Sequence, residues 1–243
     1  MGVLLLKEIR GFFSSLIGYM VVIVFLIINS LFLWVFPGSM NIPDAGYASL
    51  ESLFFIAPWI FLFLVPAITM RSFAEEKRAG TLEFLYTKPL TDLQIILAKY
   101  AGSLILVIYS LIPCFVFYWS VYKLGNPPGN LDTGGTWGAF IGLFFLSAIY
   151  VSIGIFSSAI TDNQIVAFIV AVLLCFLLFM GFDFLAEVPG LQHYDTMLLN
   201  FGINEHYKSI SRGVIDSRDV IYYLVVISAF ISLTRLKLQS HKW

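Results

Sequence analysis

Residues 71–100 read RSFAEEKRAGTLEFLYTKPLTDLQIILAKY. The segment lies between two apolar runs, each about long enough to cross a bilayer, because a helix needs about 20 apolar residues to span the hydrocarbon core. Charged residues are concentrated in it, although they make up only 12% of the whole chain. We therefore expect a polar connecting segment held between two membrane spans.

The first part of this segment carries the signals of two short helices. Residues 71–79 are good helix formers, and Gly80 is a natural stop because glycine readily adopts the left-handed conformation that ends helices. Thr81 is placed to cap a second helix, with Glu83 in its first turn, where a carboxylate opposes the helix dipole. Lys88–Pro89 ends that helix, because the residue before proline avoids the α region.

A third helix is predicted to lead directly into the next span. Thr91 and Gln94 have the spacing of a capping box, and the helix that they start continues through Lys99. The connecting segment is therefore expected to be rigid, and suited to docking into a groove of another protein. One face of its second helix is apolar: Leu82, Leu85 and Tyr86. The alternative is a solvated loop that only satisfies the preference for positive charge in the cytoplasm.

The composition of the chain indicates a membrane protein. It has 243 residues, of which 59% are hydrophobic, and a net charge of −1. A soluble domain has about a quarter charged residues, and a chain of near-zero charge is not expected to bind nucleic acid. Cys114 and Cys175 both fall in apolar runs, so we interpret them as small core or lipid-facing side chains, not as a disulfide or metal pair.

We predict an all-α, polytopic fold in which residues 1–243 form a single transmembrane domain. Six apolar segments are long enough to span a membrane: 16–36, 53–70, 100–122, 136–160, 165–186 and 219–236. Pro58, Pro66 and Pro113 predict kinks in the second and third spans. Residues 1–15 suit a short helix lying in the membrane interface, although a frayed polar end is the alternative.

The distribution of Lys and Arg predicts the orientation. One side would hold Lys7, Arg10, Arg71, Lys77, Arg78, Lys88, Lys99, Arg235, Lys237 and Lys242, and the other Lys123, Lys208, Arg212 and Arg218. This excess places both termini and residues 71–99 in the cytoplasm. An even number of spans agrees with it.

Two further motifs concern packing and partner contact. Glycines recur every four residues at the start of the fourth span, and this spacing permits close helix contact, within one subunit or at a dimer seam: Gly134, Gly138 and Gly142. A second cytoplasmic turn contains Thr161, Asp162 and Asn163. It is interpreted as a plain tight turn, or as a partner contact in which Thr161 and Gln164 form a capping box.

Residues 187–218 are predicted to form an external segment of short helices. Asp195 and Asn204 are candidate caps for helices over 196–200 and 205–212, Gly213 ends the second, and Asp216 or Ser217 starts the last span. Four residues here are of metal-binding or acid–base type: His193, Asp195, Glu205 and His206. Their spacing matches no standard zinc motif, so no metal site is predicted.

The stretch EEKRAGTLE (75–83), with the short apolar run, proline and apolar helix after it, resembles the ABC-2 class of ATP-binding-cassette permeases. The resemblance covers essentially the whole chain, and it implies the ABC-2 permease fold and external re-entrant helices. It also implies that the loop after span two is a coupling helix that docks into an ATPase subunit. The residues that would form this docking element are Glu75, Glu76, Lys77, Arg78, Gly80, Thr81 and Glu83.

The resemblance further implies the partners: a cytoplasmic ATPase, a second permease subunit and membrane lipid. The chain has no G-x-x-x-x-G-K-[ST] motif, so ATP and Mg²⁺ would bind to the ATPase and this chain would hold no cofactor and catalyse nothing. The stretch SRGVIDSRDVIYY (211–223), after the Asn-Glu-His of 204–206, is similar to the gliding-motility branch, related to copper-maturation permeases. This predicts a permease of the bacterial inner membrane that exports a cargo or drives gliding-related work.

Two other functions stay open at this point. A membrane anchor that transmits force to a cytoplasmic partner would have the same sequence features. An ion-coupled carrier is less favoured, because such carriers need buried carboxylates or discontinuous helices at the midplane. Asp183 lies near the external end of span five, and Asn29 is the main polar residue of span one.

Overall fold

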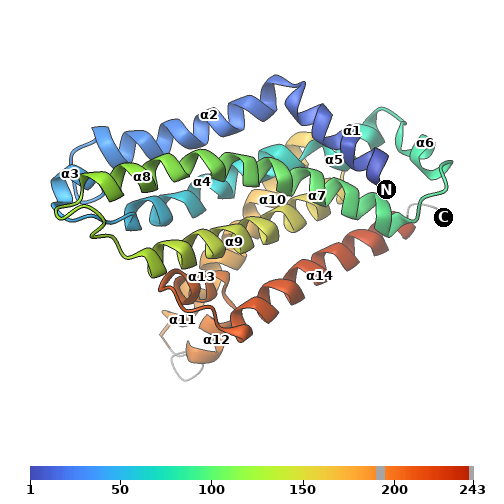
Figure 1. The fold of residues 1–243 in the computed structure, drawn as a ribbon. Helices are drawn as coiled ribbons and strands as arrows, with labels where there is room; N and C mark the ends of the chain where they lie inside the picture. The colour runs from blue at the N-terminus through green and yellow to red at the C-terminus, as the bar shows by residue number, and fades with distance from the viewer. Residues whose placement is uncertain (190–194, 241–243) are drawn as a thin grey trace.

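The protein is a helical bundle in which every described element is a helix. The computed structural model describes residues 1–189 and 195–240, and Figure 1 shows their arrangement. The first half contains α1 (Gly2–Phe13), α2 (Leu16–Ser30), η1 (Leu31–Val35), α3 (Ile42–Ala45), α4 (Glu51–Thr69), α5 (Arg71–Arg78), α6 (Leu82–Tyr86), α7 (Asp92–Leu111), η2 (Ile112–Cys114) and α8 (Phe115–Leu124). The second half contains α9 (Thr133–Ile160), α10 (Gln164–Phe176), η3 (Leu177–Gly181), α11 (Phe182–Ala186), α12 (Asp195–Phe201), α13 (Ile203–Ser211) and α14 (Ser217–Ser240).

The six predicted membrane spans are confirmed. Six helical columns in the described chain are long and apolar enough to cross a bilayer: Gly18–Val35, Glu51–Arg78, Asp92–Leu124, Thr133–Ile160, Gln164–Ala186 and Ser217–Ser240. The third column has a single 3₁₀ turn at Pro113, where the predicted kink lies. The second runs as one α-helix through Pro58 and Pro66.

Helix α9 lies at the centre of the bundle. It contacts α4, α7, α10, α13 and α14, and most of its length is buried, whereas little of α14 is buried. Small residues let the neighbours approach α9 closely. A Cβ atom added to Gly154 would lie 2.8 Å from the Cβ of Thr69 on α4. Large apolar side chains are exposed on α2, α10 and α14, the helices of the three spans with the least burial.

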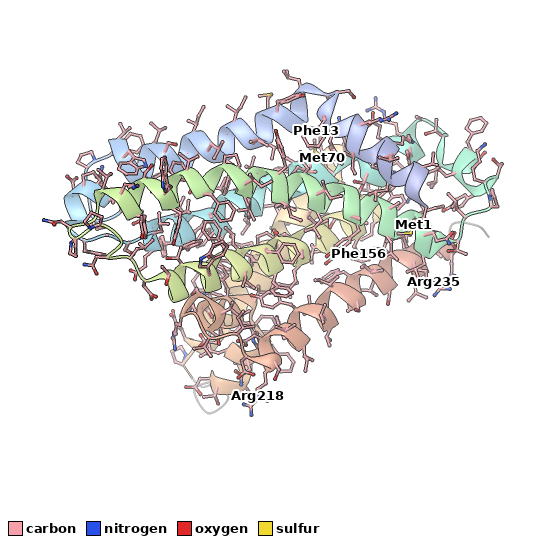
Figure 2. All side chains as sticks on the ribbon, in the orientation of Figure 1. Met1, Phe13, Met70, Phe156, Arg218 and Arg235 are labelled. Atoms are coloured by element: carbon pink, nitrogen blue, oxygen red, sulfur yellow. The ribbon has the colours of Figure 1, made fainter. Side chains whose placement is uncertain are left out.

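Both described ends of the chain lie at the same end of the bundle as α5 and α6. Figure 1 shows α1, α5, α6 and the last turns of α14 gathered there. In Figure 2, Arg218 and Arg235 mark opposite ends of α14, and Met1 lies toward the Arg235 end. The predicted N-terminal helix forms as α1, whose apolar residues Leu4 and Phe12 are buried. It packs against α7 and α2.

Several predicted helix boundaries hold between residues 195 and 218, but one predicted cap does not. Gly213 has a φ of +88° and ends α13, and the Asp216 carboxylate accepts a hydrogen bond from the Arg218 N–H at 2.9 Å where α14 begins. The predicted cap at Asn204 is wrong. Helix α13 starts earlier, with Gly202 as its N-cap, and the Asn204 amide turns inward and donates to Asp183 instead.

Candidate functional site

The candidate docking element is a direct continuation of the second span. Only Met70 separates α4 from α5. Ser158 on α9 holds this junction, because its Oγ accepts from the Phe73 and Ala74 N–H groups at 2.9 and 3.0 Å and donates to the Met70 carbonyl at 2.8 Å. One buried hydroxyl therefore satisfies three backbone groups where the helix is interrupted.

Replacing Ser158 by alanine is expected to destabilise the protein by about 1–3 kcal/mol, because buried backbone groups lose their partner. The measurement is the apparent melting temperature of the purified protein in detergent. Ser157→Ala is the matched control, since the Ser157 hydroxyl donates to the Ile153 carbonyl within its own helix and does not bond to α4 or α5. Equal effects of the two substitutions would show that Ser158 does not hold the junction.

A buried lysine ties α5 to α7 and α1. The Lys99 side chain is only 1% exposed, and its Nζ lies 3.1 Å from a Glu8 carboxylate oxygen and 2.9 Å from one of Glu76. The same ammonium lies 5.2 Å from the centre of the Phe73 ring. Lys7 pairs with Glu76 from the outside at 3.4 Å. Three helices from distant parts of the sequence are thus joined by one charge cluster.

A second tie joins the end of α5 to the end of α9. The Lys77 ammonium donates a hydrogen bond of 2.5 Å to the Ala159 carbonyl. The turn after Ala159 is formed by residues 161–163, and the alternative of a Thr161–Gln164 capping box there is wrong. Asn163 is the N-cap of α10 and accepts from the Ile165 N–H at 2.9 Å. The Thr161 hydroxyl accepts from the Asn163 N–H at 3.1 Å.

The structure divides the predicted docking residues into two groups. Glu76 and Lys77 are half-buried and bind within the protein: Glu76 forms an ion pair with Lys99, and Lys77 donates to the Ala159 carbonyl. Five others are exposed, and they lie on the outer surface of α5, the turn that follows it and α6: Glu75, Arg78, Gly80, Thr81 and Glu83. In the adjacent turn Asp162 and Asn163 are exposed and Thr161 is half-buried. The charges of the exposed group are available to a partner.

The details of the turn between α5 and α6 differ partly from the prediction. Gly80 has a φ of +66°, the left-handed conformation expected of a helix stop. Thr81 occupies the N-cap position, but it makes no capping bond. Its hydroxyl donates back to the Glu76 carbonyl at 3.3 Å. The same carbonyl, at the end of α5, also accepts the Thr81 N–H at 2.9 Å. The predicted Thr91–Gln94 capping box is confirmed.

The apolar face of α6 points inward, which corrects the predicted docking face. Leu82 is buried, and Leu85 and Tyr86 pack against the core. The opposite side presents Phe84, whose side chain is 70% exposed. Phe84 could have been noticed in the sequence, since it is an apolar residue on the face of α6 opposite to Leu82, Leu85 and Tyr86. The periodicity of apolar residues does not say which of the two faces the bundle covers. The outer surface of α5 and α6 therefore combines exposed charges with one large aromatic ring.

Gly138 and Gly142 of α9 lie against α13 and the turn after it in the same chain. A Cβ at Gly138 would lie 2.6 Å from both the Gly213 Cα and the Ile210 carbonyl oxygen. One at Gly142 would lie 3.3 Å from the Tyr207 ring. The Tyr207 hydroxyl donates to the Phe54 carbonyl at 2.7 Å, and burial raises the pKa of this hydroxyl, so it stays a neutral donor. Close packing here joins α9, α13 and α4.

Gly138→Ala is expected to destabilise the protein by about 1–3 kcal/mol, because the new methyl group meets backbone atoms that cannot rotate away. Gly134→Ala provides the control. Its Cβ would meet nothing closer than an Asp132 carboxylate oxygen at 3.5 Å, and alanine has the better helix propensity. Thermal unfolding of both variants checks this prediction, which fails if Gly138→Ala unfolds no earlier than Gly134→Ala.

Of the titratable residues predicted as candidates in residues 187–218, His206 contacts two neighbouring helices. His206 Nδ1 lies 2.7 Å from an Asp219 carboxylate oxygen and Nε2 lies 2.9 Å from the Asn200 carbonyl. The His206 ring also stacks on Tyr222 at 3.9 Å. His193 lies outside the described residues, and within them no group of three potential metal ligands is found. The His206 contacts link α12 and α13 to α14.

Comparison with known families agrees with this architecture. The family described as "ABC-2 family transporter protein" matches residues 39–193, which include α4, the α5–α6 surface and α9. This chain belongs to the ABC-2 family. The family consists of membrane transporter components, so the chain is assigned to transport and not to an enzymatic activity of its own. No curated protein matches it significantly.

For this ABC-2 family member, the matched region contains both the α5–α6 surface and the closely packed glycines of α9. The α5–α6 surface lies at one end of the second span and the α9 glycines lie at the far end of the fourth. Residues 1–38 and 194–243, which include α1, α13 and α14, lie outside the match. The charge cluster around Lys99 thus connects the matched region to a helix outside it.

Proposed function

We propose that the chain is the permease subunit of an ATP-binding-cassette transporter and that a separate ATPase subunit binds the α5–α6 surface. The ATPase would bind ATP and Mg²⁺, and this chain would hold no cofactor. The family match supports the role of permease. The exposed Glu75, Arg78 and Glu83 beside Phe84 support the docking assignment, because charged groups around an aromatic anchor are typical of protein interfaces.

The observation that carries this proposal is the rigid attachment of the surface to the spans. Helix α5 continues α4, Ser158 fastens the junction to α9, and Lys99 fastens α5 to α7 and α1. A displacement imposed on α5 would therefore move the second, third and fourth spans together and not bend a loop. Packed bundles respond to such displacement by switching between discrete arrangements.

The orientation and assembly follow from the same proposal. The α5–α6 surface and both termini would lie in the cytoplasm, where ATP is available and where Lys and Arg are in excess. The complex would sit in the bacterial inner membrane. Two permease subunits, identical or related, would pair in it, with lipid around them. The Thr161–Asn163 turn would lie beside the ATPase because it adjoins α5.

Affinity purification from native membranes in mild detergent tests the proposal. A chain with a Walker motif should be recovered with the full-length protein, and its ATPase activity should be retained. Reconstituted vesicles then test transport, with the purified complex and a labelled extract of the native cells as the source of cargo. Recovery of no nucleotide-binding chain would overturn the docking assignment, and an ATPase complex that moves no cargo would indicate a force-transmitting anchor.

The gliding-motility branch is a separate part of the proposal. It rests on the SRGVIDSRDVIYY stretch (211–223), which forms the end of α13 and the start of α14. Deletion of the gene from the native bacterium should abolish surface gliding, and expression of the intact chain should restore it. Normal gliding after deletion would leave the permease function standing and exclude this branch.

A further inference from the structure

A cavity of about 950 Å³ lies at the end of the bundle opposite to the α5–α6 surface. Its walls come from the start of α4, the start of α9, η3, α11 and α13. The volume is within the range of cavities that hold small organic ligands, about 300–1,000 Å³. The cavity lies within one chain, so it does not depend on a second subunit.

One wall of the cavity combines a carboxylate with aromatic rings. Glu51, Phe55 and Trp59 follow one another at intervals of four residues on α4, so they share one face of this helix. All three line the cavity. Glu51 belongs to the first turn of α4, and Phe55 is 60% exposed. Trp59 contacts the Phe179 ring edge to face at 5.8 Å.

The charges that line the cavity are predominantly negative. Within the described part of the chain, four carboxylates and two cationic side chains line it: Glu51, Asp132, Asp183, Glu187, Lys208 and Arg212. Two of the carboxylates are used within the fold. Asp183 accepts from Asn204 and lies 3.8 Å from the Lys208 ammonium, and Asp132 caps α9 through the Gly135 N–H.

The two remaining carboxylates, Glu51 and Glu187, give the cavity its negative charge. Glu51 and Glu187 have no ion-pair or hydrogen-bond partner for their carboxylates among residues 1–189 and 195–240. Among the described residues that line the cavity, Arg212 is the one cation left to oppose them, because Lys208 lies beside Asp183. A negative group at the end of an aromatic column is complementary to a cation, since ring faces also attract positive charge.

We propose that this cavity binds an amphipathic organic cation. The apolar body of the ligand would lie against Phe55, Trp59 and Phe179, and its ammonium or phosphonium group would lie toward Glu51. An organic anion is disfavoured by the excess of carboxylates. This binding does not depend on the docking of an ATPase, so it can be tested without nucleotide or partner.

Two probes of the same shape and opposite charge test the proposal. Tetraphenylphosphonium and tetraphenylborate have equal apolar surfaces, and their binding to the purified full-length chain in dodecyl maltoside is measured by equilibrium dialysis. The cation should bind at least about tenfold more tightly than the anion, as one favourable charge contact predicts. Equal or tighter binding of the borate would overturn the proposal.

Variants of the wall locate the site. Glu51→Gln should weaken phosphonium binding about tenfold, and Trp59→Leu should weaken it about fivefold, because the aromatic face is lost. The matched control is Glu205→Gln, on α13 at the same end but outside the cavity lining. If Glu51→Gln does not fold, Glu187→Gln in the exposed turn after α11 replaces it. Phosphonium binding that is the same in the cavity variants and in Glu205→Gln would overturn the assignment to this cavity.

Discussion

Replacing Lys99 by alanine is expected to destabilise the protein by about 3–5 kcal/mol, the usual cost of removing one partner from a buried charge cluster. Without the ammonium, the carboxylates of Glu8 and Glu76 would face each other in a site where both side chains are only 14% exposed. The packing of the lysine stem and its contact with the Phe73 ring would also be lost. The expected result is a protein that melts far earlier, with α1 detached from α7.

The measurement is thermal unfolding of the purified chain in detergent, with protease sensitivity of the N-terminal helix as a second readout. Lys88→Ala is the matched control, since Lys88 is an exposed lysine of the same connecting segment, and its loss should change stability by less than about 0.5 kcal/mol. The combined variant Glu8→Gln, Glu76→Gln and Lys99→Met should be more stable than Lys99→Ala, because it leaves no uncompensated charge. If Lys99→Ala melts like Lys88→Ala, the cluster does not hold the three helices together.

Reversing the exposed charges of α5 is expected to weaken binding of the proposed ATPase by about 2 kcal/mol or more per substitution, roughly a 30-fold loss of affinity. The substitutions are Glu75→Arg and Arg78→Glu. Both side chains are exposed and neither makes a side-chain bond to the rest of the described chain, so the fold should be unchanged. Phe84→Ala should weaken binding further, because an exposed aromatic ring is a common interface anchor.

Retention of the ATPase during affinity purification, measured against salt concentration, gives the readout. Arg218→Glu is the control. Arg218 is an exposed arginine at the start of α14, the end of that helix that lies far from α5. Glu76→Arg provides the contrast: it should lower the melting temperature because it places a cation beside Lys99. Undiminished retention of the partner by Glu75→Arg and Arg78→Glu would remove the basis for placing the docking surface on α5.

The predictions from sequence were most accurate where a local rule decides the structure. The six spans follow from the length of the apolar segments. The helix ends at Gly80 and Gly213 follow from the positive φ that glycine adopts readily. The Thr91–Gln94 capping box follows from the fixed spacing between a side chain and the backbone group that it bonds. The predictions failed where a side chain had a choice of partners. The Asn204 amide donates to Asp183, and Gly202 is the N-cap of α13 in its place. The Thr81 hydroxyl donates to a carbonyl of the preceding helix and does not cap its own.

The amino-acid sequence alone determined that the chain is an all-helical protein with six spans and a polar, helix-rich segment between the second and third. These features depend on neighbours along the chain and on the thickness of a bilayer. Only the tertiary structure decided which charges of that segment are free. Glu75 and Glu76 are adjacent and chemically alike, yet one is exposed and the other is bound to Lys99. Burial depends on which helices pack together, and that packing brings Glu8, Glu76 and Lys99 to one point from distant parts of the sequence.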